Sequence, residues 1–286
     1  MLKRADLHIH TTASDGSLTP SQVVDAAVDA SLACVAITDH DTVDGVPEAL
    51  EAGRVRGVDV VPGVEISTTY GSLSEVHVLG YFVDHLAAPL LDALRTLKNA
   101  RFERGRKMVQ RLNESGVMIS FERVAQIAQG GAIGRPHVAR ALCEVGAASS
   151  MDSAFGKFLL PGCVGYVPRY KVTPGEAVRL IRDAGGVACM AHVAKLGRDE
   201  LVIELMGEGL RAIEVYHPDH SASGSRFYAR FAEKHGLIAT GGSDAHCHEG
   251  GVRCGIGGVT VSYEVVERLR DSAGQRAPAP AREQPT

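Results

Sequence analysis

The 286-residue sequence lacks a strong net charge of either sign. Its formal charge is −4, with 30 basic and 34 acidic residues. Such a balance gives no bulk attraction to nucleic acid or to an anionic membrane. We therefore expect no general binding of duplex nucleic acid.

The sequence also lacks long apolar runs and closely spaced cysteines. No stretch approaches the roughly 18 consecutive apolar residues of a membrane span, and we expect no signal peptide, because strand-like sequence begins within a few residues of Met1. The six cysteines form no C-x-x-C pair and no dense disulfide pattern. We expect reduced, mostly buried thiols, no membrane association and a cytoplasmic location.

What is present is a regular alternation of strand-like and helix-like segments. Two helices are marked by similar starts, Thr19-Pro20-Ser21-Gln22 and Thr173-Pro174-Gly175-Glu176. Each has a capping hydroxyl, a proline in the first turn and a Gln or Glu three residues on. The alternation predicts an α/β fold, a parallel barrel of strands and helices.

The alternation is interrupted by a long stretch that is helical throughout. Helices are predicted over residues 88–115, 123–129, 135–145 and 153–158, and the next strand only at about 165–167. We therefore expect residues 84–165 to be a helical insertion, or cap, in a discontinuous barrel of residues 1–83 and 166–272. Residues 273–286, rich in Ala, Pro and charge, are expected to be a disordered tail.

The first chemical signal is Asp6-Leu7-His8-Ile9-His10, in a predicted strand. Residues two apart on a strand face the same side, so the two imidazoles point together. They repel one another once protonated, which makes a cation between them favourable. Taken alone, this pattern is weak evidence for a metal site.

Further acidic or imidazole groups lie in or just after five other predicted strands. They occur in Thr38-Asp39-His40-Asp41, Gly63-Val64-Glu65 with His77, Ala191-His192, and Gly242-Ser243-Asp244-Ala245-His246. Core strands otherwise avoid such residues, because burying an unpaired carboxylate is costly. The repetition predicts a metal site at one end of the barrel.

The order of these motifs, with Ser14-Asp15-Gly16, resembles the PHP (polymerase and histidinol phosphatase) family from residue 5 to about 246. The resemblance implies a distorted, seven-stranded, TIM-like (β/α) barrel. It also implies a centre of two or three divalent metal ions at the carboxyl ends of the strands, and hydrolysis of phosphate esters.

Nine residues match the family's ligand set. The resemblance implies a first metal held by His8, His10, Glu65 and Asp244, a second by Glu65, His77 and His192, and a third by Asp15, His40 and His246. Glu65, His192 and Asp244 are the expected catalytic residues. Nitrogen and oxygen ligands without thiolate suit Mn²⁺, which we expect, or Zn²⁺ or Fe²⁺. Asp39 and Asp41 are expected either to orient ligand imidazoles or, for Asp39, to cap the strand.

The helical insertion resembles one branch of the family, which acts on nucleoside 3′,5′-bisphosphates and on the 5′ ends of short RNAs. The matching stretch begins at Gly134-Arg135-Pro136-His137. The substrate-binding residues expected from this likeness are Arg135, His137, Arg169 and Lys171. Alternatively, Arg135 and Arg140 form a solvated helix face. One departure is Val193, where the family often has proline.

Other functions stay open on the sequence. A histidinol phosphatase or a cyclic-phosphodiester hydrolase would use the same metals, and a non-catalytic, metal-stabilised module would bind a partner. The complete set of nine ligands favours an enzyme with a small phosphorylated substrate, a nucleotide or a short RNA 5′ end. His85, His217, His220 and His235 match no motif and are expected at the surface or behind the ligands.

Overall fold

A computed structural model describes residues 3–71, 73–128, 133–168, 170, 172–247 and 255–274. Eight strands form one sheet in the order β7-β6-β5-β4-β3-β2-β1-β8. The strands are β1 (Arg4–Ile9), β2 (Cys34–Ile37), β3 (Asp59–Tyr70), β4 (Leu73–Tyr81), β5 (Val187–Met190), β6 (Ala212–Tyr216), β7 (Ile238–Gly241) and β8 (Val261–Ser262).

The sheet curls until its first and seventh strands meet. The backbone N–H of His10, just after β1, donates to the carbonyl of Ala245, just after β7, at 3.0 Å. Ile9 and Ala245 form a parallel bridge at the same place. Strands β1 to β7 therefore make a nearly closed barrel, as predicted, and β8 pairs antiparallel with the beginning of β1.

The prediction of an all-parallel barrel is wrong at one strand. β4 runs antiparallel to both β3 and β5, whereas the pairs β1–β2, β2–β3, β5–β6 and β6–β7 are parallel. Only residues 71–72 separate β3 from β4, and so short a connection permits antiparallel pairing alone. With this hairpin the barrel departs from a regular, parallel (β/α) barrel.

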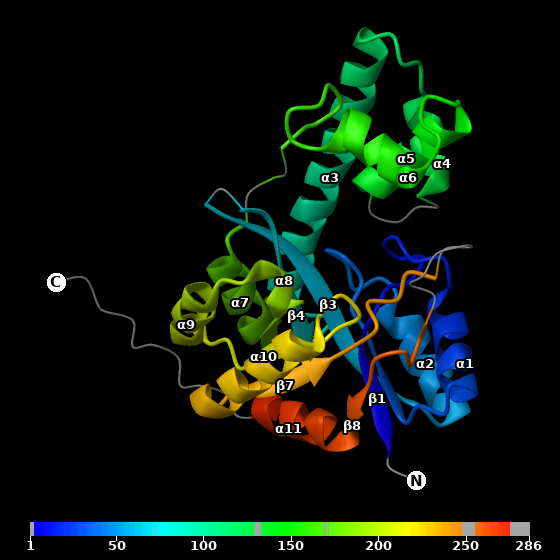
Figure 1. Ribbon diagram of the computed structural model, residues 1–286. Coiled ribbons are helices and arrows are strands. Elements are labelled where there is room, and N and C mark those ends of the chain that lie inside the picture. Colours follow the sequence, from blue (N-terminus) through cyan, green and yellow to red (C-terminus); the bar gives the residue numbers. More distant parts are fainter. Residues whose placement is uncertain are drawn as a thin grey trace, which may run out of the picture.

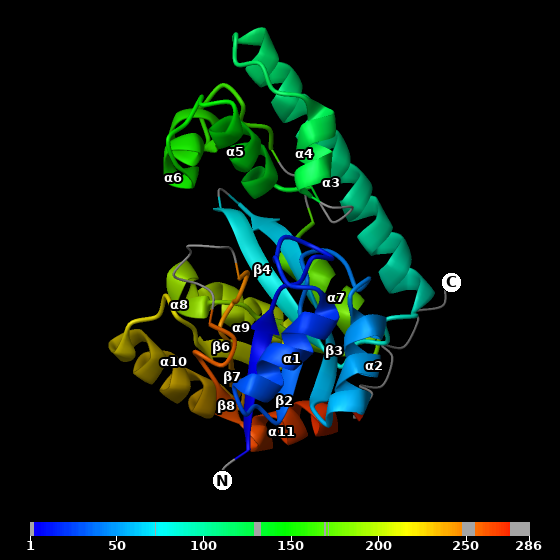
Figure 2. The same ribbon diagram turned by 90° about the vertical axis from the view of Figure 1, so that its right-hand side faces the viewer.

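Helices cover the outside of the barrel (Figures 1 and 2). They are α1 (Pro20–Asp29), α2 (Val46–Arg56), α7 (Pro174–Asp183), α8 (Val193–Leu196), α9 (Asp199–Glu208), α10 (Ala222–His235) and α11 (Tyr263–Gly274). Both predicted capping boxes form. The backbone N–H of Thr19 donates to Gln22 at 2.9 Å, and that of Thr173 donates to Glu176 at 2.7 Å.

The predicted insertion contains α3 (Ala88–Glu114), α4 (Phe121–Ile127), α5 (Arg135–Glu144), α6 (Met151–Ala154) and a π-helical turn, η1 (Phe155–Leu159). Figure 1 shows α4–α6 beside the far part of α3, beyond one end of the barrel. Met108 and Leu112 of α3 pack with them in a separate apolar cluster. Leu90 and Leu97, nearer the start of α3, pack in the main core instead. One helix therefore joins both cores.

No strand forms at residues 165–167, contrary to the prediction. The backbone groups there are used by the helices: Gly165 N–H donates to the carbonyl of Phe158, and the carbonyl of Val167 accepts from Arg104 Nε at 2.8 Å. Backbone groups engaged in this way are not available to a sheet.

The structure also bears on the predictions about membrane spans and cysteines. Among the described residues, no helix combines the length and the apolar character needed to cross a bilayer. Of the five described cysteines, only Cys34 and Cys189 are buried. The expectation that most thiols are buried is therefore not met by the described cysteines.

Closure of the barrel requires a glycine at position 242. A Cβ atom built on Gly242 would lie 2.3 Å from the backbone nitrogen of His8, so Gly242→Ala must push β1 and β7 apart. We expect the free energy of unfolding, measured by urea denaturation of the metal-free protein, to fall by about 1–3 kcal/mol.

The control is Gly207→Ala in α9, where an added Cβ meets nothing within 4 Å. Alanine favours a helix over glycine by about 0.5–1 kcal/mol, so this variant should match or exceed the wild type. Equal stability of the two variants would contradict the close contact at the seam.

Candidate metal centre

All nine predicted ligands lie at one end of the barrel. The side chains of His8 and Glu65 come from within β1 and β3, and that of His77 from β4. The others follow the carboxyl ends of strands: His10 and Asp15 after β1, His40 after β2, His192 after β5, and Asp244 and His246 after β7. The helices α4–α6 lie beyond this same end of the barrel (Figure 2).

The carboxylate of Glu65 is the middle of this group and is 1% exposed. Five imidazole nitrogens lie within 3.4 Å of it: His8 (3.4 Å), His10 (3.3 Å) and His40 (3.0 Å) face Oε2, and His77 (2.9 Å) and His192 (3.4 Å) face Oε1. The two oxygens therefore face different sets of imidazoles. This is the arrangement that a carboxylate bridging two cations requires.

Asp244 and Asp15 complete the cluster on the other side of His10. Asp244 Oδ1 lies 3.2 Å from His10 Nε2, and Asp15 Oδ1 lies 3.4 Å from His246 Nε2. The rings of His10 and His246 stack with their centroids 4.1 Å apart. One ligand atom each from Asp15, His246, His40 and His10 lies within 4.8 Å of the others. The three residues expected around a third metal are thus together, with His10 beside them.

The unpaired polar atoms of the cluster fit divalent cations. Buried atoms that make no hydrogen bond include His10 Nδ1, Asp15 Oδ1, His40 Nδ1, Glu65 Oε1 and His77 Nε2. Glu65 Oε1 is nevertheless 2.9 Å from His77 Nδ1. Two atoms bound at right angles to one cation at about 2.1 Å lie about 3 Å apart. Short separations without hydrogen bonds are therefore what a shared cation would produce.

The charges of the cluster favour binding of a cation. Burial lowers the pKa of His40 to about 4, which leaves this ring neutral, with a lone pair to donate. Burial also acts to lower the pKa of His10, but hydrogen bonds to Asp244 and Glu65 outweigh it and raise the pKa to about 10. The carboxylates therefore attract a positive charge, which a metal cation would supply in place of the proton.

Glu214 is a functional candidate that the sequence reasoning missed. Its fully buried carboxylate lies 2.9 Å from His8 Nδ1 and accepts a hydrogen bond from the backbone N–H of His192 at 2.7 Å. This contact turns the other nitrogen of His8 toward Glu65. A carboxylate in the otherwise apolar strand β6 is the same signal that revealed the predicted ligands.

His217 lies behind Asp244 and is 5% exposed. Its Nδ1 accepts from the backbone N–H of Asp219 at 3.1 Å, so its Nε2 carries the proton and donates to Asp244 Oδ2 at 3.2 Å. Of the two expected positions, surface or behind the ligands, the second is the one found. Its place directly after β6 is the sequence signal that could have singled it out.

The two aspartates beside His40 act on the backbone around it. Asp39 accepts hydrogen bonds from the backbone and side chain of Thr11, both at 2.7 Å, and from Ser14 Oγ at 2.5 Å. It thereby holds the loop that carries Asp15. Asp41 pairs with Arg101 of α3, a residue that no sequence motif indicated.

The turn at His192 forms without the proline common in the family. His192 has a left-handed backbone (φ 33°) and α8 begins at Val193. Its Nε2 still lies 3.4 Å from Glu65. The departure at Val193 therefore leaves the imidazole at the cluster.

Of the four predicted substrate-binding residues, two lie within the described part of the chain. His137 is buried, and its Nδ1 accepts from the backbone N–H of Gly134 at 3.0 Å, at the start of α5. Arg135 places its guanidinium over the ring of Phe155, 5.6 Å from the centroid. Arg169 and Lys171 lie outside the described residues.

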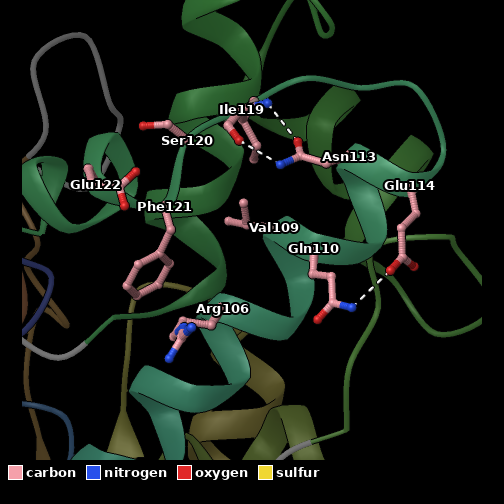
Figure 3. A pocket seen from close by; sticks show the side chains of 9 residues that line it. All are labelled: Arg106, Val109, Gln110, Asn113, Glu114, Ile119, Ser120, Phe121 and Glu122. Atoms are coloured by element: carbon pink, nitrogen blue, oxygen red, sulfur yellow. Dashed lines mark hydrogen bonds between the residues drawn. The ribbon is translucent and has the colours of Figure 1, made fainter.

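A small hollow lies between the cap helices and the loop that carries Asp15. Its walls are the loop between β1 and α1, which includes Asp15, and four residues of the cap, Ile127, Ala128, His137 and Arg140. A second hollow lies within the cap between α3 and α4 (Figure 3), lined by Arg106, Val109, Gln110, Asn113, Glu114, Ile119, Ser120, Phe121 and Glu122. No predicted ligand lines the second hollow.

Comparison with known proteins places this site in a family. The model of the PHP domain matches residues 6–148. The chain is 36% identical over 253 residues to a 3′,5′-nucleoside bisphosphate phosphatase of Chromobacterium violaceum, covering 86% of this chain and 88% of that protein. It is 37% identical over 248 residues to the 5′-3′ exoribonuclease Rnm of Salmonella typhimurium, covering 84% of each.

The fold agrees with a solved structure of a protein from Bifidobacterium adolescentis described as a metal-dependent phosphoesterase. The TM-score is 0.87 at 30% identity, over 94% of this chain and 96% of that one. These relatives confirm the predicted fold and class of enzyme. The matched family model and the two curated relatives together show that this chain belongs to the PHP domain family.

Proposed function

We propose that this chain is a metal-dependent phosphoesterase that removes phosphate from nucleotides, with nucleoside 3′,5′-bisphosphates as the main substrates. The observation that carries the proposal is the buried carboxylate of Glu65 with imidazoles on both oxygens. It is supported by the names of the two curated relatives, a bisphosphate phosphatase and an exoribonuclease.

The nine predicted ligands would hold two or three divalent ions, and Mn²⁺ is the ion that we expect. When bound, such ions lower the pKa of a water molecule towards ~7 and neutralise charge at a phosphoryl group. The protein's own part is orientation. Glu214 fixes the ring of His8 and the backbone of His192, and His217 fixes the carboxylate of Asp244. Two of the expected catalytic residues, His192 and Asp244, are thus held before a substrate arrives, and the third, Glu65, is flanked by imidazoles.

The cap provides the second half of the proposed substrate site. The hollow between the Asp15 loop and α5 contains one cationic side chain, Arg140, and the apolar side chains of Ile127 and Ala128. A nucleotide whose reacting phosphate lies on the metals would extend toward these residues. Arg140 and Arg135 then contact a second phosphate or the neighbouring nucleotide of a short RNA.

Replacing Glu65 with Gln removes the charge that both sets of imidazoles share. We expect kcat to fall by at least about 100-fold and the metal content, measured by elemental analysis, to fall with it. Glu51→Gln, at an exposed position of α2, is the control and should behave as wild type. Full activity of the Glu65 variant with its bound metal unchanged would refute the metal assignment.

Metal removal should abolish turnover reversibly. Protein treated with a chelator and desalted is expected to be inactive, to melt at a lower temperature than the loaded protein, and to recover both properties with Mn²⁺. Parallel reconstitution with Zn²⁺ and Fe²⁺ ranks the metals. Undiminished hydrolysis by protein shown to be metal-free would rule out the proposed chemistry.

Substrate preference tests the role of the cap. Binding of a remote phosphate lowers the barrier only for substrates that carry one. We expect kcat/KM for nucleoside 3′,5′-bisphosphates to exceed that for 5′-mononucleotides by at least ~10-fold, which requires about 1.4 kcal/mol. Faster hydrolysis of histidinol phosphate or a cyclic phosphodiester would show that the substrate is misassigned.

The same assay with cap variants locates the remote contact. Arg135→Ala and Arg140→Ala should raise KM for bisphosphates and reduce the preference over mononucleotides, while metal content stays the same. Arg123→Ala, which removes an exposed pair with Glu144 at the surface of the cap, is the control. Unchanged kinetics in both test variants would assign these arginines to a solvated helix face.

A further inference from the structure

Helix α3 crosses from the barrel into the cap, and Arg101 lies at the crossing. Before it, Leu94 and Leu97 pack in the main core; after it, Met108 and Leu112 pack in the cap. Arg101 therefore lies between the part of α3 that packs in the main core and the part that packs in the cap. Its side chain is only 12% exposed, so it is directed into the protein.

The guanidinium of Arg101 contacts the turn that carries His40. Its Nε donates to Asp41 Oδ2 at 2.5 Å, and its terminal NH2 group donates to Ser67 Oγ at 2.6 Å. The other carboxylate oxygen of Asp41 accepts from the backbone N–H of Ser67 at 2.7 Å. A buried acid is thus paired with an arginine from the cap helix and with strand β3.

The backbone around His40 depends on this acid. Asp41 has a left-handed conformation (φ 53°), which aspartate tolerates but does not favour. Its N–H donates to the carbonyl of Glu65 at 2.9 Å, and the N–H of Glu65 donates to the carbonyl of Asp39 at 3.0 Å. His40 lies between these two bonds and faces the Glu65 carboxylate.

We propose that Arg101 is a positioning residue that acts through Asp41 to hold His40 in the metal centre, and so couples the cap to the metals. The inference rests on the proposed function only in assuming that the cluster binds metal. Without Arg101, the carboxylate of Asp41, 2% exposed, keeps the hydrogen bond from Ser67 but loses its charged partner. Its negative charge then has no cation beside it, and a movement of the side chain toward water disturbs the turn that presents His40.

A neighbouring ion pair on the same helix provides the matched control. Lys98 Nζ lies 3.0 Å from Asp44 Oδ2, but these side chains are 43% and 62% exposed. An exposed pair contributes little to stability, and this one is one turn from Arg101. Lys98→Ala therefore removes a cation from α3 without leaving a buried acid.

The experiment is a titration of metal-free protein with Mn²⁺, with free Mn²⁺ followed by electron paramagnetic resonance and no substrate present. We expect Arg101→Ala to weaken at least one Mn²⁺ site by about 10-fold or more, and Arg101→Lys to recover part of the loss. Lys98→Ala should stay within about 2-fold of wild type. The melting temperature of each metal-free variant is measured in parallel. If Arg101 only stabilises the fold, its replacement should change that temperature and leave the Mn²⁺ affinity unchanged.

The double variant tests the route through Asp41. Asp41→Asn keeps the shape of the side chain and removes its charge, so adding Arg101→Ala to it should cause little further loss of affinity. Unchanged Mn²⁺ affinity in the Arg101 variants, an equal loss in Lys98→Ala, or additive losses in the double variant would each overturn the proposal.

If Arg101→Ala does not fold, Arg101→Lys and Asp41→Asn decide the question. A wild type that binds Mn²⁺ without preferring bisphosphates would contradict the proposed substrate and leave this inference standing.

Discussion

The burial of the Glu65 carboxylate is the constraint on which this end of the barrel depends. A carboxylate taken out of water is tolerated only with compensating charge and hydrogen bonds. Here the compensation comes from imidazoles of four strands or the turns that follow them, β1, β2, β4 and β5. One of these imidazoles, that of His8, is in turn held from behind by a second buried acid, Glu214. The carboxylate and its imidazoles therefore depend on one another for their place in this buried cluster.

Most of the metal cluster was predictable because its members interrupt apolar strands. An imidazole or carboxylate such as His77 or Glu65 stands out where neighbouring residues are Val, Ile and Leu. Glu214 carries the same signal and was missed, because none of the motifs matched in the sequence includes it. Arg101 gave no such signal, because it is one arginine among several on a long helix. Only the crossing of α3 over the His40 turn shows that this arginine contacts Asp41.

The fold was predictable in class and not in strand direction. Alternating strands and helices indicated a barrel, and capping boxes at Thr19 and Thr173 marked helix starts that the structure has. The antiparallel β4 depends on the connection at residues 71–72, which the strand pattern did not mark as a tight hairpin. Residues 165–167 have strand-like composition, but their backbone is bonded by the cap. Tertiary contacts outweighed local preference there. The division between barrel and insertion stays a prediction, since α3 packs in both cores.

The seam between β1 and the segment after β7 has a consequence for biosynthesis. His8 and His10 are synthesised early, whereas Asp244 and Ala245, which meet them across the seam, are separated from them by most of the sequence. At about 5–20 residues per second, a ribosome needs on the order of ten seconds or more to connect the two sides. Until then this edge of β1 has no neighbour, and the imidazoles of His8 and His10 lack Asp244. A chain that stops before Asp244 therefore lacks part of the predicted ligand set, and this set is complete only after residues 244–246 have been synthesised.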